Sequence, residues 1–180
     1  MKVDKKSTFE AIYNNESDAI FRFCLLRVSN REQALDITQE TFLRLWQGLL
    51  QDKEILNNKA YLFTIARRLI IDWYRKKKSF SLESIISRFD EDKEVTYEVL
   101  DEKTTEANLM LGAEGRYLLE KINELAPLYR DPVYLRLVED LSPKAIGDIL
   151  GVSTNVASVR ISRGLVELRK IAGYISDDID

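Results

Sequence analysis

The chain contains no histidine, one cysteine, three prolines and seven glycines among its 180 residues. Without histidine it lacks the commonest general base and the commonest metal ligand, and a single cysteine completes neither a zinc site nor an intrachain disulfide. Neither a glycine-rich phosphate loop nor a paired carboxylate motif is present. We therefore expect no catalysis, no cofactor, no metal site and no small-molecule substrate.

Long apolar runs are also missing, and the N-terminal residues lack the apolar stretch of a signal peptide. We expect no membrane insertion and, with one cysteine, a cytoplasmic protein. The residues are 45% hydrophobic and 32% charged, which is typical of globular proteins. Because glycine and proline are scarce while leucine and the long charged residues are common, the composition predicts an all-α fold.

The net charge of −3 is unevenly distributed along the chain. Residues 1–78 hold 15 Lys and Arg against 10 Asp and Glu, residues 79–115 hold 3 against 10, and residues 116–180 hold 9 against 10. Local fields rather than net charge govern contact with a polyanion. The first segment therefore stays a candidate for binding nucleic acid.

Helical periodicity is strong in residues 1–78, which we interpret as one three-helix domain. Ser7 and Glu10 predict a capping box at the first helix, and Asn30 predicts the cap of the second. A polar loop at 51–58 precedes the third helix. The expected helices span about 7–28, 31–50 and 59–78.

The helical periodicity of apolar residues is lost in residues 79–105, which are acidic. This composition predicts a flexible linker with a transient turn near 82–89. A second small helical domain is expected over 106–180. It should contain a helix to about 125, a break at Pro127, a helix over about 129–140, and a helix-turn-helix.

Residues 142–170 carry the helix-turn-helix signal. Its first helix, 143–150, should bury Ile146, Ile149 and Leu150, and Gly151 suits the positive φ of the turn. We expect Val152 at the corner, Ser153 or Thr154 as the next cap, and Val156, Val159 and Leu165 on the inner face of the second helix. Such a helix enters the major groove of DNA. The alternative is an ordinary helical hairpin in a bundle.

The second helix has two distinct faces. Leu35, Phe42, Leu45, Trp46 and Leu49 should point inward, whereas Asp36, Glu40 and Leu43, with Gln39 beside them, form an acidic, amide-bearing stripe. The stripe suits an arginine-rich partner, although a solvated helix face has the same spacing.

The third helix combines aromatic and basic residues, a pattern that suits nucleic acid. We expect Leu62, Ile65, Ala66, Leu69 and Trp73 to be buried, and Arg67, Arg68, Asp72, Arg75 and the run to Lys78 to lie outside. Part of the basic run could serve only to complement the helix dipole.

Three motifs in this order resemble one family. The first motif is Asp-x-x-Gln-Glu-x-Phe at 36–42, and the second is Tyr-Leu-x-x-Ile-Ala-Arg-x-Leu-x-x-Asp-x-x-Arg at 61–75. The third is the helix-turn-helix, which follows an acidic linker. Together they resemble bacterial sigma factors of the sigma-70 family. The two-domain length places the resemblance with the extracytoplasmic-function (ECF) group. It covers about residues 7–172, and its first two motifs are specific in combination.

The resemblance implies a function in promoter-specific transcription initiation. The partners would be core RNA polymerase, through its β′ clamp helices and β flap, promoter DNA, and an anti-sigma factor wedged between the two domains. The acidic linker would either imitate a phosphate backbone in the polymerase channel or be a solvated tether.

The resemblance also assigns residues to roles. The loop at about 51–60 and the third helix would melt and read the minus ten element, and the helix-turn-helix would read the minus thirty-five element. The implied polymerase contacts are Asp36, Gln39, Glu40 and Leu43; the minus ten contacts are Lys59, Tyr61, Arg67, Arg68, Arg75 and Lys76; the minus thirty-five contacts are Ser153, Thr154, Asn155, Ser158, Arg160 and Arg163.

Some positions depart from the family pattern. Ser158 and Val159 replace a frequent Lys-Ser pair, Lys144-Ala145 replaces Glu-Glu, and Arg68 stands where Asn is common. Two other functions therefore stay open: a free-standing helix-turn-helix regulator that dimerises on an operator, and a sigma-like interaction module that no longer reads promoters.

Overall fold

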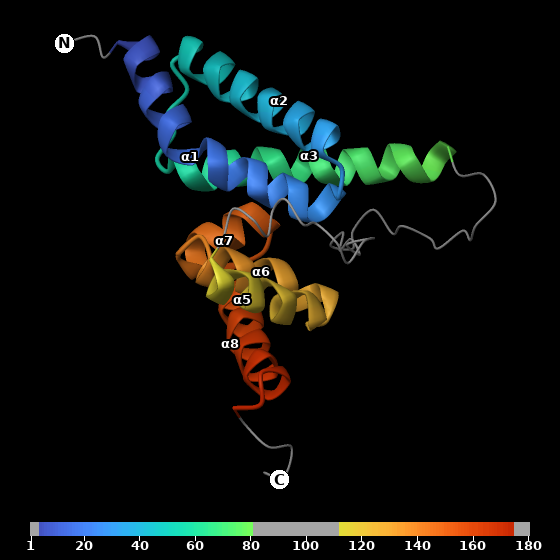
Figure 1. Ribbon diagram of the computed structural model, residues 1–180. Coiled ribbons are helices and arrows are strands. Elements are labelled where there is room, and N and C mark those ends of the chain that lie inside the picture. The colour runs from blue at the N-terminus through green and yellow to red at the C-terminus, as the bar shows by residue number, and fades with distance from the viewer. Residues whose placement is uncertain (1–3, 81–111, 175–180) are drawn as a thin grey trace. The chain divides into compact units, whose positions relative to one another are not determined.

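The computed structural model describes residues 4–80 and 112–174, which form two compact units (Figure 1). Within these ranges the chain forms helices and turns without any strand, so the predicted all-α fold with two helical domains is confirmed. The linker predicted at 79–105 and its turn near 82–89 lie outside the described residues, except that residues 79 and 80 continue a helix. Residues 175–180, which include three aspartates, also lie outside them.

The first unit consists of three helices, and each packs against the other two. These are α1 (Lys5–Val28), α2 (Arg31–Leu50) and α3 (Asn58–Phe80). The caps of α1 and α2 come from residues with short polar side chains, as helix N-termini favour. The Asn30 side chain accepts a hydrogen bond from the Gln33 N–H at 2.8 Å, which confirms the predicted cap of α2.

The capping box predicted for α1 is wrong. The cap is Asp4, whose carboxylate accepts hydrogen bonds from the Lys6 N–H at 3.1 Å and from the Ser7 hydroxyl at 2.7 Å. Because Ser7 is already inside the helix, its hydroxyl reinforces the cap and does not provide it. The end of α1 at Val28 is confirmed by Ser29, which adopts a left-handed conformation.

Aromatic side chains join the three helices. Phe23 of α1 meets Phe63 of α3 edge to face, with ring centroids 5.0 Å apart, and the Tyr74 hydroxyl donates to the carbonyl oxygen of Arg27. Phe9 and Tyr13 of α1 pack against Phe42 and Trp46 of α2. The buried apolar residues of α3 are Ala60, Leu62, Phe63, Ile65, Ala66, Ile70, Ile71 and Tyr74.

Two predicted core residues of α3 are less buried than expected. Leu69 and Trp73 are half-buried, and Phe63, Ile70 and Tyr74 fill the interior in their place. Because α3 packs against both α1 and α2, its buried arc is wider than one helical stripe and turns away from Trp73. Trp73 instead lies beside Lys77, whose Nζ is 5.0 Å from the ring centroid.

The single cysteine, Cys24, is buried in α1. Burial raises the pKa of its thiol to about 12, so the side chain stays a neutral, weakly nucleophilic thiol at physiological pH. We therefore assign Cys24 to the core.

The second unit also consists of helices, and its last helix packs against the other three. These are α5 (Ala113–Glu124), α6 (Pro127–Leu137), α7 (Pro143–Leu150) and α8 (Thr154–Ile171). A break between the two helices was predicted at Pro127; it lies at 125–126, and Pro127 itself begins α6 because proline suits the first position of a helix. The predicted start of this domain at residue 106 lies outside the described residues.

The corner between α7 and α8 has the predicted helix-turn-helix geometry. Ser142 caps α7 and Ser153 caps α8, and Gly151 ends α7 with φ of 74°. A further glycine that we did not predict shapes the corner: a Cβ atom on Gly147 would lie 2.9 Å from the Val152 carbonyl oxygen. The turn therefore folds back on α7 so closely that only glycine fits without a shift.

The inner face predicted for α8 is wrong. Val156 and Val159 are 40% and 48% exposed, and Leu165 is half-buried. The buried residues of α8 are Ala157, Ile161, Gly164 and Leu168. Small residues on this face let α8 approach α6 closely, and a Cβ atom on Gly164 would lie 2.5 Å from Val133 Cγ2.

We expect Gly164→Ala to lower the free energy of unfolding of the second unit by about 1–3 kcal/mol, the usual cost of overpacking. Denaturant unfolding followed by circular dichroism measures it. Gly48→Ala is the matched control, because this helical position meets its nearest neighbour, Tyr61 Oη, at an ordinary 3.5 Å. The control should be neutral or stabilise the chain by up to about 1 kcal/mol. Equal stability of Gly164→Ala and the parent would contradict the close packing of α6 and α8.

Candidate functional site

One exposed surface of the first unit combines leucines with carboxylates. On α2, Asp36, Gln39 and Leu43 are exposed and Glu40 is half-exposed. Leu35, which we predicted on the inner face, is 37% exposed and lies beside Asp36. We call Leu35, Asp36, Gln39, Glu40 and Leu43 the α2 face. The α2 face therefore combines apolar area with hydrogen-bond acceptors, and protein interfaces use both.

The geometry of α2 explains this exposure. Ala34, Ile37, Phe42 and Leu45 are buried, so the opposite side of the helix faces solvent. The Glu40 carboxylate accepts a hydrogen bond from Arg44 Nε at 2.8 Å. Such an exposed pair contributes little to folding. Glu40 is therefore available to exchange Arg44 for a partner's arginine.

A second exposed surface runs along α3. Tyr61, Arg68, Asp72 and Arg75 follow one another at helical spacing, and the last three are exposed. We call these four residues the α3 stripe. Arg75 lies 4.0 Å from Asp72, a weak exposed pair, and the exposed Lys76 adds positive charge at the edge. The stripe thus offers a ring at one end and guanidinium groups at the other.

The predicted outer position of Arg67 is wrong. Its side chain is only 7% exposed, on the side of α3 that packs into the bundle. Arg67 lies on the same side of α3 as Ile70 and Tyr74. Arg68 lies on a different side, because successive residues of a helix point about 100° apart. Little of Arg67 is therefore accessible to a ligand.

The loop between α2 and α3 is fixed at both ends. Lys5 Nζ lies 2.7 Å from Asp52 Oδ1 and 3.1 Å from the Leu50 carbonyl oxygen, and Asn57 Oδ1 accepts a hydrogen bond from the Ala60 N–H at 2.9 Å. Between these anchors Leu56 is 91% exposed. We did not predict this residue, because the exposure of an apolar side chain in a loop is known only from the structure.

Tyr61 connects this loop to the α3 stripe. Lys53 Nζ lies 3.3 Å from the Tyr61 hydroxyl oxygen and 4.6 Å from the ring centroid. Lys59, in the first turn of α3, is half-exposed. The ring, the lysines and the exposed Leu56 therefore belong to one end of α3, where an aromatic surface and positive charge occur together.

The exposed side of α8 forms a third surface. Asn155, Val159 and Arg163 are exposed and spaced four residues apart, so they lie on one face of the helix. We call these three residues the α8 stripe. Ser153 and Thr154 are exposed at the helix N-terminus, whereas Ser158 is half-buried and its hydroxyl donates to the Thr154 carbonyl oxygen at 2.9 Å.

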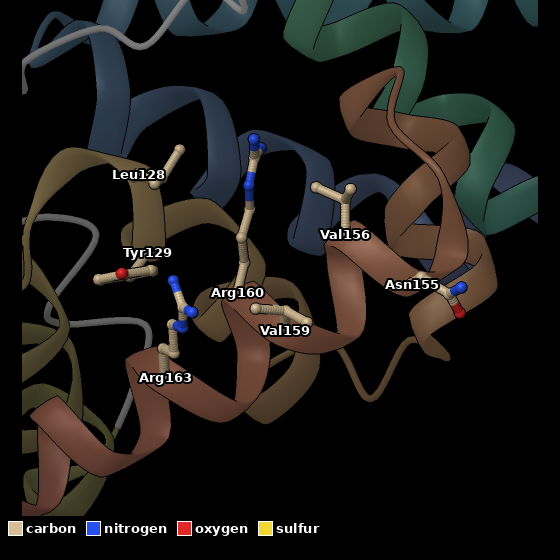
Figure 2. A pocket seen from close by; sticks show the side chains of 7 residues that line it. All are labelled: Leu128, Tyr129, Asn155, Val156, Val159, Arg160 and Arg163. Carbon is tan, nitrogen blue, oxygen red and sulfur yellow. The ribbon is translucent and has the colours of Figure 1, made fainter.

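An open pocket of about 310 Å³ lies between α8 and the start of α6 (Figure 2). Arg160 and Arg163 extend from α8 toward Leu128 and Tyr129. The pocket is lined by Leu128, Tyr129, Asn155, Val156, Val159, Arg160 and Arg163. Two guanidinium groups beside apolar walls suit a ligand that carries both negative charge and apolar groups.

A helix-turn-helix in one unit and a basic, aromatic helix in the other define a DNA-binding transcription factor. No helix within 4–80 or 112–174 has the length and apolar character to cross a membrane. These features agree with the comparisons to known proteins.

Two family models match the chain and together span more than half of it. Sigma-70 region 2 matches residues 12–80, and Sigma-70 region 4 matches residues 115–168. The chain is 29% identical to the ECF RNA polymerase sigma factor SigW of Bacillus subtilis over 94% of its own length and 91% of that protein's. It is 25% identical to the RNA polymerase sigma factor YlaC of the same organism, over 92% of each chain.

Solved structures share the fold. The sigma factor RpoE of Bartonella quintana, in complex with the anti-sigma factor NepR, matches 94% of this chain and 99% of its own, with 20% identity and a TM-score of 0.64. CnrH, in complex with the cytosolic domain of CnrY, matches 95% of this chain and 91% of its own, with 18% identity and a TM-score of 0.57.

The chain belongs to the sigma-70 family of RNA polymerase sigma factors, in its ECF group. It binds core RNA polymerase and promoter DNA and directs transcription initiation. The region 2 match excludes a free-standing helix-turn-helix regulator, because such a regulator has no polymerase-binding domain.

Proposed function

We propose that the two units divide the work of promoter recognition between them. Residues 1–78 bind core polymerase and the minus ten element, residues 106–180 read the minus thirty-five element, and 79–105 is the acidic linker. The observation that carries this division is the pair of exposed surfaces on one three-helix unit: the α2 face presents carboxylates and leucines, while the α3 stripe presents arginines and a ring. A protein and a polyanion can therefore be bound at once.

The α2 face contacts the β′ clamp helices of the polymerase in this proposal. Asp36, Gln39 and Glu40 supply acceptors for a basic surface, and Leu35 and Leu43 supply apolar area that a partner would bury. Charge complementarity speeds encounter, and buried leucines slow dissociation. The second unit adds a contact to the β flap.

The α3 stripe and the loop before it hold the opened minus ten element. Arg68, Arg75 and Lys76 follow the backbone, while Tyr61 and the adjacent loop receive an unstacked base, with Lys59 nearby. Stacking on a ring and contact with phosphates are how proteins hold single strands. Arg67 does not contact DNA in this proposal. Its side chain is buried, so it contributes to the packing of this unit.

The α8 stripe enters the major groove at the minus thirty-five element. Ser153 and Thr154 at the N-terminus of α8 lie where phosphates are bound, and Asn155 and Arg163 supply donors to base edges. Arg160 contributes positive charge beside them. Ser158 plays a smaller part, because its hydroxyl is occupied within the helix.

The protein acts in the cytoplasm without catalysing a reaction of its own, and an anti-sigma factor regulates it. The support for such a partner is that the solved structure of the sigma factor RpoE contains the anti-sigma factor NepR. A partner that covered the α2 face would compete directly with polymerase. When this partner is bound, the DNA-contacting residues would be unaffected, but the chain could not bind polymerase.

In vitro transcription with purified core polymerase on a promoter library tests the proposal as a whole. We expect transcripts from a subset of promoters that share two elements at fixed spacing. Loss of the minus thirty-five element, which is the upstream element, should weaken initiation. Loss of the minus ten element, which is the downstream element, should abolish it. If the chain bound core polymerase but started no transcript from any library member, it would be an interaction module and the proposed promoter reading would be wrong.

We expect Leu56→Ala to lower the yield of open complexes about tenfold, because the variant would lose apolar contact with an unstacked base, at about 0.8 kcal/mol for each buried CH₂ group removed. Permanganate reactivity of unpaired thymines measures the yield. Affinity for core polymerase should not change, since the loop lies outside the α2 face.

Leu137→Ala is the matched control for this test, because Leu137 is an exposed leucine, at 41%, in the second unit. It should melt the promoter as the parent does. Normal strand opening by Leu56→Ala would remove the loop from the proposed mechanism.

A further inference from the structure

Val159 lies on the α8 stripe without any role in the core. Its side chain is 48% exposed, while the contacts of α8 with the rest of the unit involve Ala157, Ile161, Gly164 and Leu168. An exposed β-branched residue does not favour a helix over the long, unbranched residues common on such surfaces. Neither packing nor helix propensity therefore accounts for valine at this position.

The neighbours of Val159 on the stripe are hydrogen-bond donors. Asn155 lies one turn before it and Arg163 one turn after it, and both are exposed. An amide pairs with adenine, and a guanidinium group pairs with guanine or a phosphate. Val159 lies between them and has no donor or acceptor, so it can distinguish bases only through apolar contact.

Thymine is the only base that presents an apolar group, its C5 methyl, in the major groove. We propose that Val159 packs against the C5 methyl group of one thymine in the upstream promoter element and thereby selects that base. The inference rests on the proposed entry of α8 into the major groove. Val156, 40% exposed and three residues earlier, lines the same pocket as Val159 and adds apolar area to it (Figure 2).

The charges around Val159 favour DNA over a protein as the occupant. Arg160 and Arg163 line the same pocket as Val159, and none of the described residues that line it carries a carboxylate. Ser153 caps α8 by accepting a hydrogen bond from the Val156 N–H, and residues 153–155 at this helix N-terminus are exposed, where the helix dipole favours a phosphate. A duplex supplies phosphates and a methyl group together.

The test uses the holoenzyme and a promoter obtained from the library transcription. Each thymine of the upstream element, on both strands, is replaced singly by uracil, which lacks only the C5 methyl group. For the parent chain we expect one position at which uracil lowers promoter affinity about fourfold, the value of one buried methyl group. All affinities are compared at one salt concentration.

Val159→Ser should bind the unmodified promoter more weakly and show no difference between thymine and uracil at that position. Val166→Ser is the matched control, because Val166 is 46% exposed on the same side of α8 but two turns further from the N-terminus. The N-terminal residues of a recognition helix reach the bases, so this control should keep the thymine preference. Circular dichroism confirms that both variants are folded.

Several results would overturn the inference. The inference is wrong if uracil has no effect on the parent chain at any position. It is also wrong if Val159→Ser keeps the parent's affinity and thymine preference. Weaker binding of Val159→Ser to core polymerase alone would assign the residue to a protein contact. If Arg160→Ala with Arg163→Ala also left promoter binding unchanged, the proposed reading by α8 would fail as well; if that variant bound weakly, only the role of Val159 would be wrong.

Discussion

Replacing Asp36 and Glu40 together with alanine is expected to lower the affinity of the chain for core RNA polymerase about tenfold or more. Both carboxylates belong to the α2 face, and removing one partner of a buried, hydrogen-bonded charge pair at an interface costs about 2–5 kcal/mol. Folding should be unaffected, because Asp36 is exposed and the pair between Glu40 and Arg44 is a surface pair. Fluorescence anisotropy of the labelled chain titrated with core polymerase measures the affinity.

The control for this variant removes the same charge from another helix of the same unit. Glu10→Ala with Asp18→Ala truncates two exposed carboxylates of α1, so its polymerase affinity should equal that of the parent. The thermal midpoints of both variants should also match that of the parent. Unchanged affinity after loss of Asp36 and Glu40 would remove the α2 face from the polymerase contact, whereas an equal loss in the control would point to net charge alone.

Local signals in the sequence were sufficient for much of the fold. Asn30, Ser142, Ser153 and Gly151 are short polar or glycine residues at helix ends, and their effect depends on a few neighbouring backbone groups. The boundaries of α2 and α7 were therefore predictable. The capping box at α1 failed because Asp4, an equally good cap, comes earlier in the chain and the preceding turn extends the helix.

The direction of each helix face was harder to predict, because tertiary packing decides it. Ala157 and Gly164 form the inner face of α8, and small residues carry little hydrophobic signal. The larger Val156 and Val159 were therefore assigned inward by hydrophobicity, although close packing against α6 requires small side chains there. The same reasoning applies to Arg67, whose position in α3 became interior because two neighbouring helices cover that side.

The candidate site was predictable where its residues repeat at helical spacing on an exposed side. Asp36, Gln39 and Leu43 on α2, and Arg68 and Arg75 on α3, are exposed as expected. Leu56 and Val159 were missed because an exposed apolar residue can be recognised only once burial is known. Their roles, like those of the other site residues, stay predictions for the experiments above.

Replacing Arg160 and Arg163 together with alanine is expected to lower holoenzyme affinity for a promoter with an upstream element about tenfold or more, because each contact to a base edge contributes about 1–3 kcal/mol. If both arginines contact phosphates, the slope of log affinity against log salt should fall by about two. Filter binding or anisotropy over a series of salt concentrations measures both quantities. The chain has a net charge of −3, so these local charges matter more than the total.

Arg169→Ala with Lys170→Ala separates local contact from general charge. This control removes the same two charges from the same helix, but from its exposed last turn, far from the N-terminus of α8. Its promoter affinity and salt slope should stay close to the parent's, with a small loss of stability because basic residues favour a helix C-terminus. If both variants lowered affinity equally, the arginines would supply only nonspecific attraction. If transcription from a promoter that depends on its upstream element survived the loss of Arg160 and Arg163, a surface other than α8 would have to read that element.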